Sequence, residues 1–219
     1  MSNRLTVLLL AMMLGIQPIT SDLYLPALPA ITQEFGATMA HAQLTLSAML
    51  LAFGVSQMFW GPLSDLWGRR PVLLWSLSAY TVAGVLCVLA PSIDTLIVWR
   101  TVQGAAMGAV VMCGRAIVRD LYTPNTGARV MSKALTGLGF IACVSAPLGA
   151  WLTETYSWHW VFFVNLPFGA ITVLGLAVFM DETKQDQNLR FDWFGFGLLA
   201  KIVLAWSIVF FIVFFNVYQ

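Results

Sequence analysis

The first apolar run of the chain reads LTVLLLAMMLGIQPITSDLYLP from residue 5 to residue 26. A helix needs about 20 mostly apolar residues to cross the hydrocarbon layer of a membrane, so this run is long enough. Asp22 lies near its far end, although a carboxylate at the centre of a bilayer costs roughly 2.5–3.5 kcal/mol on insertion scales. The run therefore predicts a membrane helix whose carboxylate has either a compensating partner or a function.

Further apolar runs of spanning length follow along the chain. They lie at residues 43–63, 72–91, 95–117, 132–153, 160–180 and 195–217. The chain is 59% hydrophobic and only 10% charged, whereas a soluble domain has roughly 25% charged residues. The runs are too long for the strands of a membrane barrel. We therefore expect an all-α membrane protein in which six helices form a bundle and a seventh, truncated helix follows.

The positively charged residues between the runs are confined to alternate connections. Arg69 and Arg70 lie in the second connection, and the fourth and sixth connections are also basic. The connections at 27–42, 92–94 and 154–159 contain neither Lys nor Arg. Because cytoplasmic loops carry the excess of Lys and Arg, the N-terminus is predicted to be cytoplasmic, in a plasma membrane or bacterial inner membrane.

Composition also limits the classes of function. The net charge is +1, which provides no basic field for binding a nucleic acid. The three cysteines lie in apolar runs, where they are expected to be buried hydrophobic side chains. The sequence has no metal-binding cluster of His, Cys and Asp, no serine–histidine arrangement and no phosphate-binding glycine loop, so no enzyme, metal site or cofactor is predicted.

Two charged residues lie inside predicted spans at a similar depth. With a rise of 1.5 Å per residue, Asp22 lies about 26 Å from the cytoplasmic start of the first helix. By the same rise, Arg100 lies about 9 Å from the outer end of the fourth helix. The two side chains can therefore pair if the helices pack side by side. Such a pair is either a structural ion pair or a proton or substrate site that faces a polar cavity.

The connection between the second and third helices has an unusual order of glycines and charges. It reads GPLSDLWGRRP from Gly61 to residue 71. Gly61 and Pro62 are expected to end the second helix, and Gly68 permits a tight turn. Asp65 is a candidate conformational lock. We expect its carboxylate to pair with a cation at the cytoplasmic end of the fourth helix, such as Arg115 or Arg119.

Three stretches of sequence resemble a known family. The pattern Gly61-x-Leu-Ser-Asp65-x-x-Gly68-Arg-Arg resembles the signature loop of the major facilitator superfamily. The stretch DLYLPALP that begins at Asp22 resembles the drug:proton antiporter branch, of the bicyclomycin and chloramphenicol resistance type. The stretch RTVQG that begins at Arg100 is similar to the arginine motif that this branch associates with proton coupling.

One stretch departs from that branch. The antiporter motif of the fifth helix has a Gly-Pro pair followed by paired glycines, whereas this chain has APLGA around Pro147. A kink at Pro147 and close packing at Gly139 and Gly149 are expected to remain. The stretch WHWVFFVNLPFG that begins at Trp158 resembles instead the drug exporters with fourteen helices.

The resemblance implies a secondary active transporter that exports small drug-like or amphipathic compounds in exchange for protons. Asp22 and Arg100 would carry the proton coupling. A second set would line the substrate cavity, namely Gln17, Gln57, Gln103 and Met107. A third set would gate the cytoplasmic side, namely Gly61, Asp65, Gly68, Arg69, Arg70, Arg115 and Arg119. The alternatives are a truncated or split membrane protein that does not transport, and a metabolite importer of the same fold.

The superfamily builds its transport path between two six-helix halves. The resemblance therefore implies an N-terminal six-helix domain at 1–180, a cytoplasmic linker at 181–194, and the start of a second, incomplete half at 195–219. The expected partners are a small-molecule substrate, protons and membrane lipid. A missing C-terminal half or a second copy of the chain would complete the transport path.

Overall fold

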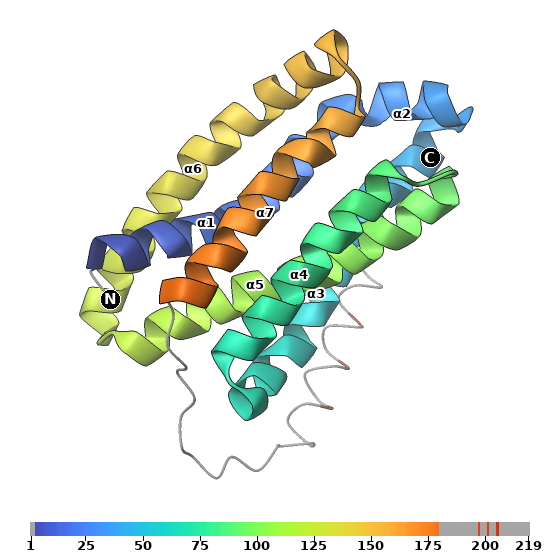
Figure 1. The fold of residues 1–219 in the computed structure, drawn as a ribbon. Helices are drawn as coiled ribbons and strands as arrows, with labels where there is room; N and C mark the ends of the chain where they lie inside the picture. Colours follow the sequence, from blue (N-terminus) through green and yellow to red (C-terminus); the bar gives the residue numbers. More distant parts are fainter. Residues whose placement is uncertain (1–2, 180–196, 198–200, 202–204, 206–219) are drawn as a thin grey trace. The chain divides into compact units, whose positions relative to one another are not determined.

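The computed structural model describes residues 3–179 and the single residues Gly197, Lys201 and Ala205. The part from 3 to 179 is helical, without a strand, and Figure 1 shows its order. The elements are α1 (Asn3–Asp22), the 3-10 helix η1 (Leu25–Ala27), α2 (Leu28–Phe35), α3 (Met39–Trp67), α4 (Arg69–Val88), α5 (Ile93–Leu121), α6 (Pro124–Thr155) and α7 (His159–Phe179).

Six stretches of the described residues are long and apolar enough to cross a membrane. The first combines α1, η1 and α2, and the other five are α3 to α7. The prediction of six membrane helices is therefore confirmed. Residues 1–185 form one compact unit, and the chain from residue 186 onward forms another. The predicted linker at 181–194, and the seventh helix at 195–217 apart from three single residues, lie outside the described residues.

The helices extend further than hydropathy predicts. The connection expected at 27–42 contains the helix α2, which follows η1 directly; both have a proline in the first turn, and α2 is followed by Gly36 in the left-handed conformation (φ 59°). Proline suits the first turn of a helix and glycine suits its end. The second helix was expected to end near Gly61, but α3 includes Pro62 and ends at Trp67, just before Gly68. Hydropathy detects only the apolar part of a helix, whereas polar end turns are equally helical.

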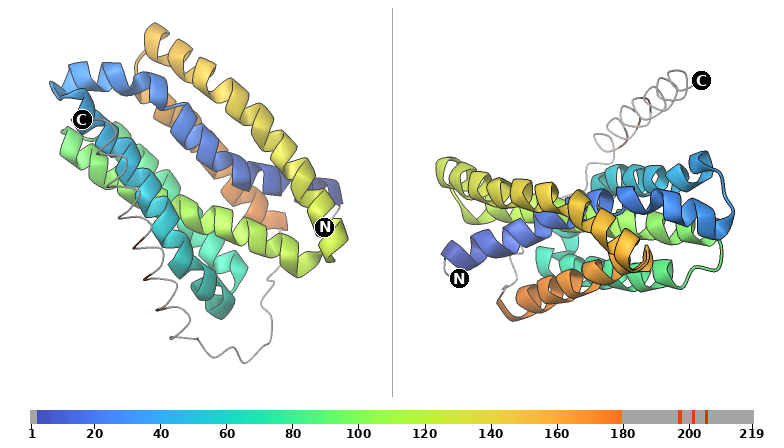
Figure 2. Two further views of the ribbon diagram at one scale, coloured as in Figure 1. Left: turned by 180° about the vertical axis from the view of Figure 1, so that it is seen from behind. Right: turned by 90° about the horizontal axis from the view of Figure 1, so that it is seen from above.

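The helices pack in neighbouring pairs. α3 lies against α5, α4 lies against both α5 and α7, and α1 lies against α6, as Figure 2 shows from behind and from above. α3 and α5 touch at their backbones, because a Cβ atom at Gly104 would overlap the carbonyl oxygen of Met49. Gly108, one turn further along α5, lies against α3 in the same way. Small residues four apart allow such close approach of membrane helices.

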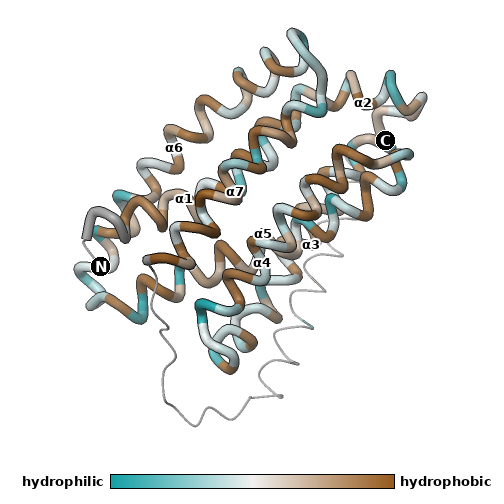
Figure 3. The backbone as a smooth tube through the Cα atoms, viewed as in Figure 1, coloured by the Kyte–Doolittle hydropathy of each residue, from teal (hydrophilic) through white to brown (hydrophobic). Residues whose placement is uncertain are grey.

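Two clusters of buried apolar side chains hold the bundle together. The central core includes Met13, Leu77 and Met107. The α2-end core lies near the last turn of α2; its buried members are Leu23, Tyr24, Ala27, Leu28, Ile31, Ala42, Cys87, Ile93, Leu96, Leu152, Trp158, Val161 and Phe162. Figure 3 shows hydrophobic residues along the middle of the helices and hydrophilic residues at several turns.

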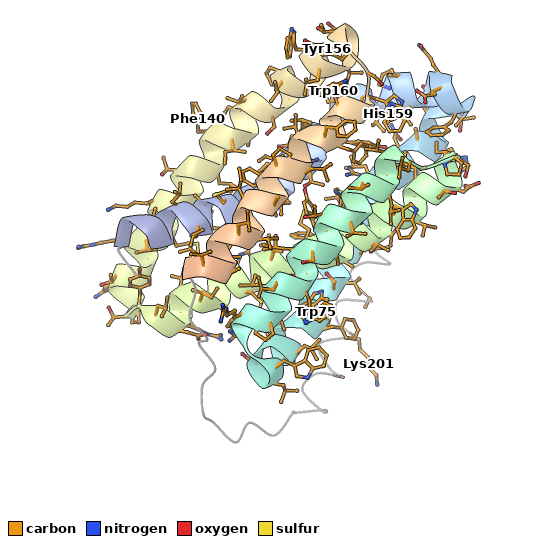
Figure 4. The ribbon with its side chains drawn as sticks, in the orientation of Figure 1. Trp75, Phe140, Tyr156, His159, Trp160 and Lys201 are labelled. Carbon is orange, nitrogen blue, oxygen red and sulfur yellow. The ribbon has the colours of Figure 1, made fainter. Side chains whose placement is uncertain are left out.

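Large apolar side chains also cover the outer surface of the bundle. Trp75 is 77% exposed and Phe140 is 75% exposed, and Figure 4 shows Phe140 pointing away from α6. A soluble monomer rarely exposes apolar surface on this scale. Together with the length of the helices, this surface indicates a protein surrounded by lipid or by further apolar protein.

Candidate functional site

Arg100 is completely buried in the second turn of α5. Its Nη1 donates to Oε1 of Gln103, three residues further along the helix, at 2.9 Å. Its Nη2 donates to the backbone carbonyl of Thr20 on α1 at 3.3 Å. Nε of Arg100 and Nε2 of Gln103 are buried and have no hydrogen-bond partner among the described residues. The arginine therefore joins α5 to α1 with part of its hydrogen-bonding capacity unused.

Two aromatic rings cover the guanidinium group. Cζ of Arg100 lies 4.0 Å from the ring centroid of Tyr24 and 5.4 Å from that of Phe162. The two rings meet edge to face, with centroids 5.7 Å apart. Such contacts stabilise a cation, the more so when it is removed from water. The hydroxyl of Tyr24 in turn hydrogen-bonds to Thr45 of α3 at 2.7 Å.

The expected ion pair between Asp22 and Arg100 is absent from the described part of the chain. Asp22 is half-buried, and its Oδ1 accepts a hydrogen bond from the hydroxyl of Ser21 at 2.7 Å. The rise per residue predicted the depth of both charges, but not the side of α1 on which Asp22 lies. The residues on the side that meets Arg100 are Thr20 and Tyr24, which flank Asp22 in the sequence.

The predicted cavity residues lie in different surroundings. Gln103 is fully buried beside Arg100. Gln57 is half-buried and donates to the carbonyl of Phe53 on its own helix at 3.3 Å. Gln17 is also half-buried, and its carbonyl accepts from Ser21. Met107 is fully buried in the central core. Among the contacts described for this set, the hydrogen bond with Arg100 involves Gln103.

Several polar contacts near Arg100 were not predicted. The hydroxyl of Thr20 hydrogen-bonds to that of Tyr80 on α4 at 2.6 Å, and both side chains are buried. Phe162, which covers Arg100, comes from α7. Tyr24 lies within the DLYLP stretch that begins at Asp22, so its place in that motif could have marked it as a candidate site residue. Nothing in the sequence indicates that Tyr80 contacts α1 or that Phe162 contacts α5.

The turn between α3 and α4 centres on Arg69, which is 5% exposed. Arg69 forms an ion pair with Asp65 and donates to the hydroxyl of Ser64. Its Nε also donates to Oδ2 of Asp120, near the end of α5, at 3.1 Å. Gly68 adopts a φ of 97°, a conformation that favours glycine and turns the chain between the two helices. Arg69 therefore joins the ends of α3 and α5.

The predicted partners of Asp65 were wrong. Arg115 and Arg119 are exposed on α5, and Nε of Arg119 lies 3.7 Å from Oδ1 of Asp120. The turn at Gly68 brings Arg69 next to Asp65, so the acidic group needs no cation from α5. The missed residue is Asp120, which directly follows Arg119 in the sequence and takes the second bond from Arg69.

Two further residues of this turn contact other helices. Nη2 of Arg70 donates to the carbonyl of Ala177, near the end of α7, at 2.9 Å. Gly61 is buried against α5, where a Cβ atom would lie 3.2 Å from Cε of Met112. The predicted gating residues other than Arg115 and Arg119 are thus in contact with one another or with helices α5 and α7.

Replacement of Asp120 with alanine is expected to lower the free energy of unfolding by about 1.5–3 kcal/mol, the usual contribution of a hydrogen bond to a charged group. Asp120 and Arg69 have side chains only 7% and 6% exposed, so water cannot replace the lost carboxylate easily. Thermal unfolding of the purified protein in detergent measures the change. Glu154→Ala, at an exposed acid on α6, is the matched control; equal midpoints for both variants would contradict the prediction.

The glycines of α6 behave differently from one another. A Cβ atom at Gly149 would overlap the carbonyl oxygen of Leu23, so α6 touches the backbone just beyond α1 at this point. Gly139 is exposed, and no atom of the described residues lies within 4 Å of its Cβ position. The close packing expected at Gly139 was therefore wrong, because this glycine is on the outward side of α6. Pro147 lies inside the helix, as expected.

Six long apolar helices, a completely buried arginine and a charged turn together define a helical membrane protein with a polar site inside the bundle. The sequence model of the Major Facilitator Superfamily matches residues 9–219. The chain therefore belongs to the Major Facilitator Superfamily, and it is a multi-pass membrane protein. The resemblance to this superfamily seen in the sequence is confirmed.

Relatives of the chain include transporters named for drug resistance. It is 35% identical over 181 residues to the uncharacterized MFS-type transporter YdgK of Bacillus subtilis, covering 80% of this chain and 44% of the relative. It is 29% identical over 202 residues to Multidrug resistance protein 3 of the same organism, covering 91% and 38%. With a Multidrug resistance protein B homolog of Mycobacterium tuberculosis, the identity is 32% over 169 residues, covering 76% and 31%. The chain thus spans less than half the length of these relatives.

A solved structure has the same fold. The crystal structure of the human organic anion transporter MFSD10 (TETRAN) matches with a TM-score of 0.63 and 21% sequence identity. The match covers 84% of this chain and 49% of the human chain. At this identity the likeness concerns the fold alone.

Proposed function

We propose that this chain forms the N-terminal half of a proton-coupled transporter that exports small drug-like or amphipathic compounds. The superfamily and the relatives named for multidrug resistance support transport of small molecules. The observation that carries the coupling is Arg100, a buried cation that has no carboxylate partner among residues 3–179. An ionisable group inside a membrane protein generally marks a transport or proton pathway.

Asp22 is the proposed proton-binding group. It lies between Thr20 and Tyr24, the two residues of the first span that contact Arg100, and it remains partly exposed. A proton on Asp22 would remove a negative charge close to this buried cation and change the local electrostatic energy. A ligand or proton that favours one of two conformations shifts the population toward it. Protonation of Asp22 would thereby couple to the direction in which the transporter opens.

Arg69 and its partners are the proposed lock on the opposite side of the membrane. Arg69 joins α3 to α5 through Asp65 and Asp120, and Arg70 joins α4 to α7. By the positive-inside rule, the basic residues at this end support a cytoplasmic location for it and for the N-terminus, in the proposed plasma membrane or bacterial inner membrane. Gln17, Gln57 and Gln103 are proposed to contribute to the substrate cavity in the open states; Met107 would do so only if helix movements expose it.

The transport path requires a second six-helix half. The chain covers 44% of YdgK, so a C-terminal half supplied by the same or another chain would complete the transporter. A second copy of this chain is the other proposed source. In both cases substrate would bind between the halves.

The proposal is tested in inverted membrane vesicles from cells that produce this chain with and without a supplied C-terminal half. Vesicles with an acidic interior are expected to accumulate labelled chloramphenicol or a labelled lipophilic cation when both halves are present. A protonophore that dissipates the gradient should abolish this accumulation. Accumulation that persists after the gradient is lost would contradict proton coupling, and the absence of accumulation for a broad set of compounds would contradict drug export.

A further inference from the structure

Glu34 in the last turn of α2 is joined to the beginning of α7. Its Oε2 accepts a hydrogen bond from Nε1 of Trp158, and its Oε1 lies 4.0 Å from Nε2 of His159. Trp158 is 2% exposed, so its indole N–H has little access to water as a hydrogen-bond acceptor. Buried tryptophan N–H groups usually have a hydrogen-bond partner. Glu34 is therefore the group that satisfies this donor, across 124 residues of sequence.

The indole of Trp158 is also part of a series of ring contacts that ends at Arg100. Trp158 meets Phe162 edge to face, with ring centroids 6.0 Å apart and planes at 80°. Phe162 meets Tyr24 in the same manner, and both of these rings cover the guanidinium of Arg100. Phe35, next to Glu34, also packs against the indole, with ring centroids 5.8 Å apart. The indole of Trp158 is thus fixed by two residues of α2, and it packs in turn against Phe162.

The surface position of Glu34 sets it apart from the buried rings. Its side chain is 49% exposed, whereas Phe162 and Tyr24 are completely buried. Figure 4 shows the side chain of His159 close to the end of α2, where α7 begins. Glu34 therefore links the exposed surface at this end of the bundle, through Trp158, to the rings that cover Arg100.

We propose that Glu34 and Trp158 are positioning residues for Arg100. Glu34 fixes the orientation of the indole, the indole fixes Phe162, and Phe162 with Tyr24 keeps the guanidinium directed at Thr20 and Gln103. Release of the indole would free Phe162 and open the α2-end core, and the adjoining guanidinium of Arg100, to water. The importance of this arrangement for coupling rests on the proposed function, but the arrangement itself can be tested without transport.

Cys87 and Cys113 provide a direct measurement of such opening. Both thiols are completely buried, but Cys87 belongs to the α2-end core and Cys113 to the central core. The third cysteine, Cys143, is exposed and is replaced by serine in every variant. The rate at which N-ethylmaleimide modifies each thiol, followed by mass spectrometry of the full chain in membranes, then reports the opening of each core separately.

Glu34→Leu is expected to raise the rate of modification at Cys87 by about tenfold, as for a hydrogen bond of about 1.4 kcal/mol, and to leave Cys113 unchanged. Trp158→Phe keeps a ring but removes the donor, so it should raise the rate at Cys87 by a similar factor. The double variant should add little, because both changes remove the same bond. Glu34→Gln keeps an acceptor oxygen and should restore protection of Cys87.

The matched control is Glu154→Leu, which removes an exposed acid from the end of α6 that leads into α7. It should leave both thiols protected. An equal rise at Cys87 and Cys113 in Glu34→Leu would show general loosening and overturn the proposal, as would an unchanged rate at Cys87. Failure of the Glu34→Gln rescue would also overturn it. Failure of the proposed function would instead appear as proton-independent transport, which leaves these thiol measurements unaffected.

Discussion

Replacement of Gly104 with leucine is expected to abolish folding of the bundle. A side chain at this position would overlap the backbone of Met49, so α3 and α5 would have to separate. Overpacking by a few methylene groups already costs about 1–3 kcal/mol in cores that can adjust, and a backbone carbonyl has less freedom to move than a side chain. The fraction of protein that elutes as a single species in detergent measures the effect, and almost none is expected.

Gly139→Leu is the matched control for this prediction. Gly139 also lies inside a long helix, but its Cβ position has no described atom within 4 Å. Since leucine favours a helix over glycine by up to about 1 kcal/mol, the control is expected to fold at least as well as the natural chain. Equal yields of the Gly104 and Gly139 variants would mean that α3 and α5 do not pack as described.

Replacement of Arg100 with methionine is expected to leave a folded protein that no longer couples transport to protons. The charge is buried without a carboxylate partner in the described residues, so its removal leaves no unpaired acid behind. Gradient-driven accumulation in vesicles with both halves should fall to about one hundredth, as expected for two hydrogen bonds from a charged group at about 1.5 kcal/mol each.

Arg100→Lys separates the charge from the shape of the side chain. Lysine keeps a positive charge but lacks the planar fork that reaches Gln103 and Thr20 together and stacks on Tyr24. We expect it to restore only a small part of the accumulation. Full accumulation with lysine would show that charge alone matters, and full accumulation with methionine would remove Arg100 from the coupling.

The sequence allowed the number of membrane helices to be predicted, because hydrophobic length is set by the bilayer. It did not allow the contacts between charged residues to be predicted. Asp22 and Arg100 were expected at matching depths, but the side of the helix on which Asp22 lies depends on how α1 packs. Asp65 met Arg69 instead of Arg115 because of the turn at Gly68, whose effect on pairing could not be seen from residue spacing.

The sequence also did not allow us to predict which glycines pack against another helix. Gly139 and Gly149 both belong to the predicted fifth helix, yet only Gly149 touches the backbone of another segment. The distinction depends on which side of α6 faces the bundle. The contact between Glu34 and Trp158 was likewise invisible, since it joins a segment expected to be a loop to the start of the last described helix. Local sequence predicts elements well, whereas partners are set by the tertiary arrangement.

Gradient-driven export by Asp22→Asn, in vesicles where both halves are present, tests the proposed coupling most directly. Asparagine has nearly the shape of aspartate and can still accept the hydrogen bond from Ser21, but it cannot take up a proton. We expect the variant to bind labelled substrate as the natural protein does and to lose accumulation that depends on the proton gradient. Proton-driven export at the natural rate would contradict the assignment of Asp22 and, with it, the coupling through Arg100.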